Sequence, residues 1–202
     1  MKLYYSPGAC SLAPHILIKE TGLDCELIKV STKTHSVHTE NDFYAINPKG
    51  YVPFLQLDNG EFMSEGPVIC QYLCDLARRE DLMPAAGTLA RYRVMEWQGY
   101  INSEIHKSFS PLFNSAFGTD AKALHTTLLE KKLAWVSRQL GQSTFLTGST
   151  FTAADAYLFV VVNWAKVVNV SIEGLSELAA FQQAVRTRPA VQAALQAEGL
   201  KS

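Results

Sequence analysis

The pattern of strand and helix signals in this 202-residue chain changes near residue 84, and that change most constrains its fold. Before it, short apolar runs predict strands that alternate with helices. After Met83-Pro84-Ala85-Ala86-Gly87 no strand pattern recurs. With 48% hydrophobic and 18% charged residues, the chain can bury a substantial core in one or two domains. We therefore expect a mixed α/β half followed by an all-helical half.

The first half predicts a small mixed sheet with helices on its faces. Asp58-Asn59-Gly60 lies between two apolar runs and is typical of a hairpin turn. Ser64 is expected to cap the helix that follows the hairpin. The predicted elements are a strand at Leu3–Tyr5, a helix at Leu12–Glu20, a strand at Glu26–Val30, an irregular loop at Ser31–Asn41 with a short helix after it, strands at Val52–Leu57 and Glu61–Met63, and a helix with Val68, Ile69, Tyr72, Leu73 and Leu76 on its apolar face.

The second half predicts long helices near residues 89–112, 120–140, 152–168 and 175–199. Thr152 and Asp155 have the spacing of a capping box, and Phe151 stands where a hydrophobic staple residue would lie. The helix that they open is apolar nearly all round, so we expect it to run through the middle of the helical half. This motif is a folding signal.

Cys10 lies between the first predicted strand and the first predicted helix, in Tyr4-Tyr5-Ser6-Pro7-Gly8-Ala9-Cys10-Ser11-Leu12. At the N-terminus of a helix, unpaired N–H groups and the macrodipole favour an anion. Such a position lowers the pKa of a thiol from about 8.5 and yields a usable thiolate. The alternative is a small, half-buried packing cysteine.

Charge and composition indicate which partners and compartments fit. The net charge of −1 favours neither nucleic acid nor an anionic membrane as a partner. No signal peptide pattern opens the sequence, and the most apolar run, 156–162, is too short to span a membrane. Four cysteines lack the density of a disulfide framework, which indicates reduced thiols in a cytoplasmic protein.

Cys70 and Cys74 are spaced i, i+4 and therefore share one face of a helix. A metal site would need a second pair of ligands, and no His or Cys stands near these two at a suitable spacing. We expect both to be small packing residues and expect no metal.

The motifs together resemble the cytosolic glutathione transferases over essentially the whole chain. The bacterial beta class is most similar, because it has a cysteine at this strand–helix junction where other classes use Tyr or Ser. The segments that carry the resemblance are Lys2-Leu-Tyr-Tyr-Ser-Pro-Gly-Ala-Cys-Ser-Leu, Asn47-Pro-Lys-Gly-Tyr-Val-Pro53, Glu65-Gly66, Glu104-Ile-His-Lys107, Phe151-Thr-Ala-Ala-Asp-Ala-Tyr-Leu-Phe159 and Ala197-Glu-Gly-Leu200. The resemblance implies a thioredoxin-like glutathione-binding domain at 1–80 and an all-helical domain at 87–202.

The implied function is transfer of glutathione, as co-substrate, to a small hydrophobic electrophile in detoxification. Proximity and charge stabilisation would drive that reaction. The resemblance also implies a homodimer, with the region around Ser103–His106 close to the partner's site. Walls of the electrophile site would come from Phe109, Phe113, Tyr157 and Trp164, each of which is otherwise an ordinary core residue.

The resemblance also implies contacts to glutathione from the first domain. Pro53 is cis in the family, where an ordinary trans proline is the alternative. Val52 would then pair with the cysteinyl backbone of glutathione as an added strand does. Glu65 and Gly66 would bind the γ-glutamyl end at a helix N-terminus, although such a Glu is also a common dipole complement.

Gly99, Ser103 and His106 are spaced i, i+4, i+7, so one face of a regular helix would carry them. By resemblance that face, with Glu104, looks across the cleft towards Cys10. If His106 is not simply structural, it is either a hydrogen-bond donor to the sulfur or a proton acceptor whose pKa suits neutral pH.

Two positions depart from the beta-class pattern. Gly99 stands where the class usually has Asn, and His35 stands where it has Lys. The second change weakens the expected contact to the glycyl carboxylate of glutathione, unless Lys33 reaches in its place. We therefore expect lower affinity for glutathione than is typical.

Two other functions remain open. The first is glutathione-dependent disulfide exchange or peroxide reduction through Cys10. Position 13 is Ala13, so this chemistry would be monothiol, with glutathione as the resolving partner. The second is non-enzymatic sequestration of ligands by a protein that retained the fold.

Overall fold

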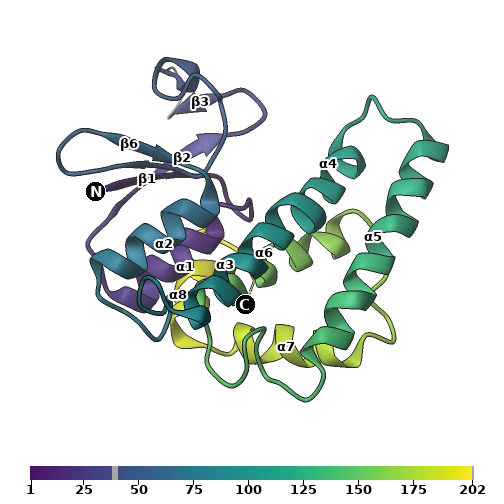
Figure 1. Cartoon of the computed structure of the whole chain (residues 1–202). Helices are drawn as coiled ribbons and strands as arrows, with labels where there is room; N and C mark the ends of the chain where they lie inside the picture. The colour runs from purple at the N-terminus through teal and green to yellow at the C-terminus, as the bar shows by residue number, and fades with distance from the viewer. Residues whose placement is uncertain (38–40, 202) are drawn as a thin grey trace. The chain divides into compact units, whose positions relative to one another are not determined.

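The computed structural model describes residues 1–37 and 41–201, and its elements are labelled in Figure 1. The chain divides into two compact units. The first contains Met1–Glu80 and the segment from Arg188 onward, and the second contains Asp81–Thr187. The sequence indicated a division near residue 80 but placed all of 87–202 in the helical domain. The structure instead groups the last helix with the sheet.

The first unit is built on one mixed sheet in the order β4-β3-β2-β1-β5-β6. β1 pairs in parallel with β2, and the other neighbouring pairs are antiparallel. The strands are β1 (Lys2–Tyr5), β2 (Glu26–Ser31), β3 (Ser36–Val37), β4 (Asn41–Asp42), β5 (Phe54–Gln56) and β6 (Phe62–Ser64). The predicted small mixed sheet is confirmed.

Two predicted segments of this sheet differ clearly from the structure. The predicted strand from Val52 shortens to β5, because Pro53 has no N–H to donate to a ladder. The segment predicted as an irregular loop contains β3 and the start of β4, and its residues 38–40 lie outside the described residues. The short helix expected after it is the 3₁₀ helix η1 (Phe43–Ala45).

The described residues of the first unit also form the α-helices α1 (Leu12–Thr21), α2 (Gly66–Leu76) and α8 (Pro189–Ala197). α8 packs against α1. The Arg188 guanidinium donates two hydrogen bonds to the Glu20 carboxylate, at 2.6 and 3.0 Å. The predicted single helix 175–199 is wrong, because the helix is interrupted before Pro189, which has no N–H to donate to a preceding turn and begins α8.

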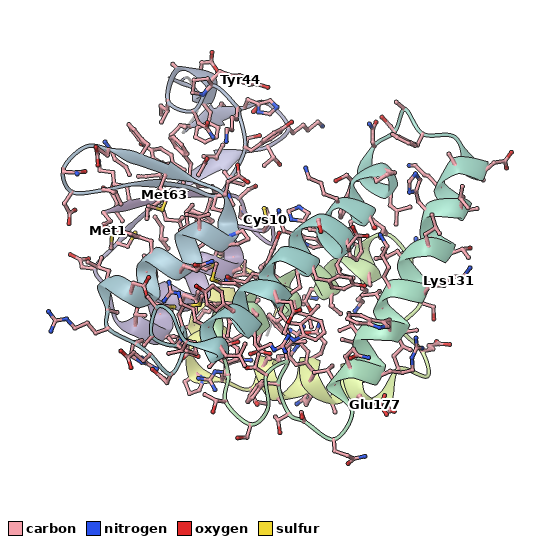
Figure 2. The ribbon with its side chains drawn as sticks, in the orientation of Figure 1. Met1, Cys10, Tyr44, Met63, Lys131 and Glu177 are labelled. Atoms are coloured by element: carbon pink, nitrogen blue, oxygen red, sulfur yellow. The ribbon has the colours of Figure 1, made fainter. Side chains whose placement is uncertain are left out.

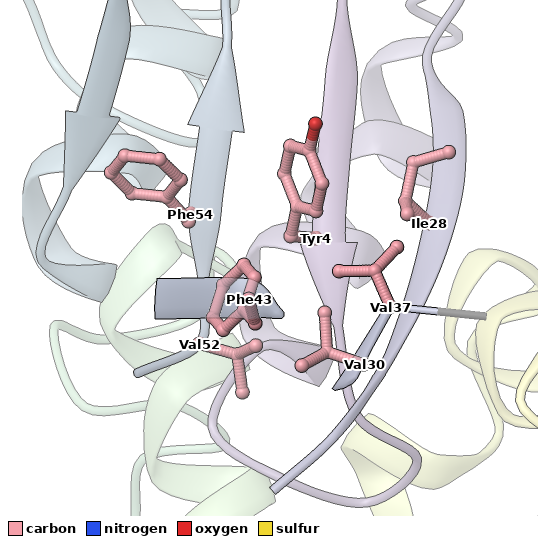
Figure 3. Close-up of a cluster of buried hydrophobic side chains, with 7 residues drawn as sticks. All are labelled: Tyr4, Ile28, Val30, Val37, Phe43, Val52 and Phe54. Atoms are coloured by element: carbon pink, nitrogen blue, oxygen red, sulfur yellow. The ribbon is translucent and has the colours of Figure 1, made fainter. Parts of the chain in front are cut away.

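Alternation along β1 separates two cores. Tyr4 belongs to the cluster in Figure 3, together with Ile28, Val30, Val37, Phe43, Val52 and Phe54. Leu3 and Tyr5 face the other way and pack with Ile18 of α1 and with α2. The helices α1 and α2 therefore cover this second face (Figure 1).

The buried face of α2 differs in part from the prediction. Ile69 and Leu73 are buried as expected, but Val68 and Leu76 are 49% and 48% exposed. Cys70 and Cys74 are also buried, as packing residues would be. The predicted Ser64 cap is wrong, because Ser64 is the last residue of β6 and the N-cap position is Glu65.

The second unit is helical, and none of its described residues forms a named strand. Its elements are α3 (Leu89–Tyr100), the π-helix η2 (Ile101–His106), α4 (Lys107–Phe113), α5 (Thr119–Leu140), α6 (Ala153–Val167) and α7 (Ser176–Arg186). The predicted helix 89–112 is thus continuous but contains a π segment. None of the described helices combines the length and apolarity needed to cross a membrane.

α6 is buried along nearly its whole length, as its all-round apolar sequence predicted. The predicted capping box is confirmed. Asp155 Oδ2 accepts hydrogen bonds from the backbone N–H and the hydroxyl of Thr152, at 2.8 and 2.7 Å. Asp155 Oδ1 accepts from Leu146 N at 2.8 Å. Burial raises the pKa of Asp155 to about 6.

Replacing Asp155 with Ala should lower the free energy of unfolding by about 3 kcal/mol, because the buried donors of Leu146 and Thr152 lose their acceptor. Since folding raises the pKa of Asp155, its stabilising contribution is largest below about pH 4 and falls as pH rises to about 6. Urea unfolding at pH 4 and pH 7 should therefore show a wider gap between wild type and variant at pH 4.

The matched control is Asp120→Ala, which removes an exposed acid from the first turn of α5. Its cost should stay under about 1 kcal/mol, because only a helix-dipole contribution is lost. Equal losses in the two variants would contradict the buried capping role of Asp155.

Candidate functional site

The predicted site residues are distributed over the two units, and each set is described within its own unit. The first unit carries Cys10, Lys33, His35, Val52, Pro53, Glu65 and Gly66. The second carries Gly99, Ser103, Glu104 and His106. Cys10 is labelled in Figure 2, at the junction of β1 and α1.

The loop before α1 is fixed at two points. Ser11, the N-cap residue, is fully buried, and its hydroxyl accepts from Ser6 N at 3.1 Å and donates to Ser6 O at 3.2 Å. Glu198 Oε2 accepts from Gly8 N at 2.8 Å, and Glu198 Oε1 lies 2.8 Å from Nδ1 of the buried His15. The chain on both sides of Cys10 is therefore held by hydrogen bonds that are at least partly buried.

Cys10 occupies the position that the sequence predicted, directly before the N-cap of α1. Its half-buried thiol donates a hydrogen bond to the carbonyl oxygen of Val52, with Sγ and O 3.2 Å apart. A carbonyl oxygen accepts only from a protonated thiol, so this bond stabilises the thiol form. The N-terminus of α1 favours the thiolate instead. The two effects oppose one another at one sulfur.

The other cysteines lack this setting. Cys70 and Cys74 are buried in α2, and burial raises the pKa of Cys70 well above its usual value. Cys25 is half-buried, and burial also raises the pKa of its thiol. No group of three His, Cys, Asp or Glu among the described residues is placed to hold a metal ion.

The Val52–Pro53 peptide bond is cis, as the resemblance implied. It lies between η1 and β5, and Val52 itself belongs to the core of one sheet face. The backbone carbonyl of Val52 is the acceptor for Cys10. Two predicted site features, the cysteine and the cis proline, are thus in direct contact through one hydrogen bond.

Glu65 precedes α2 in a backbone conformation that non-glycine residues rarely adopt, with φ of 71°. Its carboxylate pairs with Lys49, at 3.0 Å, and Lys49 also donates to Ser64 Oγ at 3.1 Å. At the start of α2, the N–H groups of Gly66 and Val68 have no partner within the helix, whereas Pro67 has no N–H and the N–H of Ile69 donates to Glu65 O. Glu65 and Gly66 therefore place a carboxylate and free N–H groups side by side.

His35 is held by two contacts. Its Nδ1 lies 3.1 Å from the carbonyl oxygen of Gly50, and its ring packs on Tyr44 with centroids 4.7 Å apart. A carbonyl oxygen can only accept, so Nδ1 carries a proton. Lys33 is exposed and makes no hydrogen bond or ion pair with another described residue. The ring is thus positioned, whereas the lysine is not.

In the second unit, His106 lies in a cluster of aromatic side chains. Its Nδ1 is 2.6 Å from the hydroxyl oxygen of Tyr157, and its ring meets that of Trp164 with centroids 4.8 Å apart. Burial, and then the charge of Lys107, lower the pKa of His106 to about 4. This pKa lies below the neutral range expected from the sequence, so the ring is neutral at pH 7, and the role of His106 stays a prediction.

The face that was to carry Gly99, Ser103 and His106 is not that of a regular α-helix. Ser103 still contacts the preceding turn, because its hydroxyl donates a hydrogen bond to Gly99 O at 3.1 Å. The π-helix η2 adds a residue per turn, so His106 is displaced around the helix from the predicted position. Glu104 is paired with Lys132 at 2.8 Å, a partner that the sequence did not indicate.

The aromatic residues predicted to wall an electrophile site form one cluster. Trp164 meets Phe109 and Phe113 at centroid distances of 5.6 and 5.9 Å. Phe109 and Tyr157 are buried, whereas Phe113 is 50% exposed. Within this unit, Phe113 therefore offers much more apolar surface to a ligand than the two buried rings.

Sequence reasoning assigned no role to Asn102, Lys132 or Glu198. Glu198 lies in the terminal Ala197-Glu-Gly-Leu200 segment, which carried part of the resemblance. Asn102 accepts a hydrogen bond from Tyr157 at 3.0 Å. Each of these residues acts on a partner far away in the sequence, so no local pattern could reveal it.

These observations define a class of protein. A thioredoxin-like unit presents one cysteine ahead of its first helix, next to a cis proline, and the same chain continues into a helical unit. Such an architecture joins a sheet domain that carries a half-buried thiol to helices that carry aromatic side chains.

Comparisons with known proteins agree with this class. A model of the glutathione S-transferase N-terminal domain matches residues 8–76, and one of the C-terminal domain matches residues 119–196. A glutathione S-transferase of Escherichia coli O157:H7 is 45% identical over 201 residues, with all of both chains covered. Two solved structures are 41% identical and cover all of both chains: a sphingomonad glutathione S-transferase complexed with glutathione, with a TM-score of 0.94, and a beta-class enzyme of Sphingomonas chungbukensis, with a TM-score of 0.95.

The chain belongs to the glutathione S-transferase family and is similar throughout to bacterial members, the beta class among them. It is a transferase that uses glutathione as co-substrate. The sequence-based assignment of family and fold is confirmed.

Cys10 should react first when the protein meets a limiting amount of iodoacetamide at pH 7, because burial protects the other three cysteines or raises the pKa of their thiols. Peptide mapping by mass spectrometry should find most of the label on Cys10. Cys10→Ala should remove it, and the control Cys25→Ala should retain it. Label spread evenly over the four cysteines would contradict this assignment.

Proposed function

We propose that this transferase conjugates the thiolate of glutathione to small hydrophobic electrophiles, as a detoxifying, cytoplasmic homodimer. The observation that carries the proposal is the cluster in the first unit, where the Cys10 thiol meets the Val52 carbonyl beside a cis proline. The family resemblance supports the homodimer, and the absence of a disulfide framework supports the cytoplasm.

Glutathione would bind along the first unit in an extended form. The backbone of Val52 offers an edge at which the cysteinyl part can pair as an added strand. The N–H groups at the start of α2 suit the α-carboxylate of the γ-glutamyl end, and the Glu65 carboxylate suits its ammonium group. Lys33 and His35 are the candidates for binding the glycyl carboxylate. Cys10 would then lie between the γ-glutamyl end and the glycyl end of the bound glutathione.

The second unit would supply the remaining roles. Ser103, Glu104 and His106 come from η2, with Gly99 just before it, and His106 acts on the reacting sulfur. A Cβ added at Gly99 would meet nothing within 4 Å, so the absent Asn side chain has left open space there. The aromatic cluster of Phe109, Phe113, Tyr157 and Trp164 would hold the apolar electrophile.

Monothiol disulfide exchange is the second candidate, and the exposed part of the Cys10 thiol favours it. Glutathione would act as resolving partner because Ala13 replaces the second cysteine of a CxxC pair. Conjugation needs only the sulfur of glutathione, whereas exchange needs the sulfur of the protein. The two activities therefore depend differently on Cys10.

Cys10→Ala should abolish reduction of a glutathione mixed disulfide while only altering conjugation of an aryl halide, because the attacking sulfur in conjugation belongs to glutathione. Both activities are measured on one preparation, with Cys25→Ala as the control that retains both. If wild type binds glutathione in calorimetry but catalyses neither reaction, ligand sequestration is correct and the proposal fails.

Lys33→Ala should raise the dissociation constant for glutathione about fivefold, which corresponds to about 1 kcal/mol for a partly exposed charge contact. Titration calorimetry measures the change. The control Lys29→Ala removes another exposed lysine of the same unit and should leave the constant unaltered. Equal constants for wild type and Lys33→Ala would assign the glycyl carboxylate to His35 or to neither residue.

A further inference from the structure

Three side chains of the second unit form a continuous chain of hydrogen bonds. The hydroxyl of Tyr157 donates to Asn102 Oδ1 at 3.0 Å, and Nδ1 of His106 lies 2.6 Å from the same hydroxyl oxygen. Tyr157 comes from α6, while Asn102 and His106 come from η2. The chain therefore ties the π-helix to the buried central helix of its unit.

The direction of these bonds follows from what each atom can do. An amide oxygen only accepts, so the single proton of the Tyr157 hydroxyl is directed at Asn102. The hydroxyl oxygen can then only accept from His106. Nδ1 of His106 must carry a proton.

The other ring nitrogen is thereby defined. In a neutral imidazole only one nitrogen carries a proton, so Nε2 of His106 has a free lone pair. Nε2 has no hydrogen-bond partner among the described residues, and it is not one of their buried unpartnered atoms. An outside group can therefore reach it.

We propose that Tyr157 and Asn102 are positioning residues that hold His106 as the Nδ1-protonated tautomer, so that its Nε2 meets the thiol of glutathione as a proton acceptor. This inference rests on the proposed function of His106. It decides between the two roles that the sequence left open, because a neutral ring with its proton on Nδ1 has none on Nε2 to donate to sulfur.

The proton step balances. The S–H bond of the glutathione thiol breaks, its proton forms the Nε2–H bond of His106, and the electron pair stays on sulfur as thiolate. Nδ1–H remains bonded to Tyr157 throughout. The resulting imidazolium presents Nε2–H to the thiolate, and after the thiolate has bonded to the electrophile the proton passes to solvent or to the leaving group.

The surroundings of the ring favour the neutral acceptor before glutathione arrives. Tyr157 and Trp164 of α6 pack against the ring, and neither carries a charge in these contacts. The charged neighbour that acts on it is Lys107, the next residue along the chain, which opposes protonation. Lys132 of α5 is paired with Glu104. A thiolate formed beside the ring would supply the negative charge that favours the imidazolium.

The direct test is the long-range ¹H–¹⁵N spectrum of the His106 ring in the full-length protein at pH 7, assigned with His106→Asn. Wild type should show the proton on Nδ1. Tyr157→Phe removes the acceptor and should remove that preference. Asn102→Ala frees the Tyr157 proton to point at Nδ1 and should move the ring proton to Nε2. An Nε2-protonated ring in wild type overturns the proposal, whatever the variants do.

Conservative variants separate positioning from packing. Asn102→Asp keeps an acceptor for Tyr157 and should keep the Nδ1 tautomer. Tyr100→Phe removes a hydroxyl from the adjoining helix α3 and should change neither the tautomer nor the rate. kcat/KM for conjugation should fall at least about tenfold in Asn102→Ala and Tyr157→Phe. Shifted tautomers with unchanged rates would overturn the acceptor role.

Failure of the proposed function gives a different result. In that case wild type would conjugate no electrophile, although its His106 spectrum would still show the Nδ1 tautomer. A different result would overturn this inference alone. If wild type conjugates electrophiles and His106→Asn does so at the same rate, the transferase function holds and the acceptor role of His106 is wrong.

Discussion

The carboxylate of Glu198 is the interaction on which the arrangement around Cys10 depends. One oxygen accepts from Gly8 N and the other lies against Nδ1 of His15, each at 2.8 Å. The side chains of His15 and Glu198 are fully buried, so the pair is tolerated only because both carboxylate oxygens have partners. A residue near the end of the chain thus fixes the loop that carries the thiol, which explains why α8 groups with the sheet.

Local sequence signals were sufficient for most of the fold. Asp58-Asn59-Gly60 makes the turn between β5 and β6, and Thr152 with Asp155 caps α6, because each motif acts on residues only a few positions away. The site residues of the first unit were predicted by type and order for a similar reason, since Cys10 precedes a helix that its own sequence defines. The cis state of Pro53 came from the family resemblance and not from the residues alone.

Three features of the site that the sequence did not reveal share a physical cause, which is that tertiary contacts decide them. The sequence gives His106 no sign of an altered pKa, whereas burial in the folded protein, and then the charge of Lys107, lower its pKa to about 4. The sequence around Glu104 indicates no ion pair, because its partner Lys132 comes from a different helix, α5. Nothing local marks η2 as a π-helix either, yet its extra residue per turn changes the direction in which His106 points.

The contact between Cys10 and Val52 connects the two chemistries considered for this protein. The Val52 carbonyl has two lone pairs, so the Cys10 thiol and a ligand N–H can share it as acceptor. A second donor makes that oxygen a weaker acceptor for the thiol, whereas the N-terminus of α1 continues to favour the thiolate. We therefore expect bound glutathione to change the balance between thiol and thiolate at Cys10. The sulfur that is idle in conjugation would then be most reactive towards a disulfide when its resolving partner is already bound.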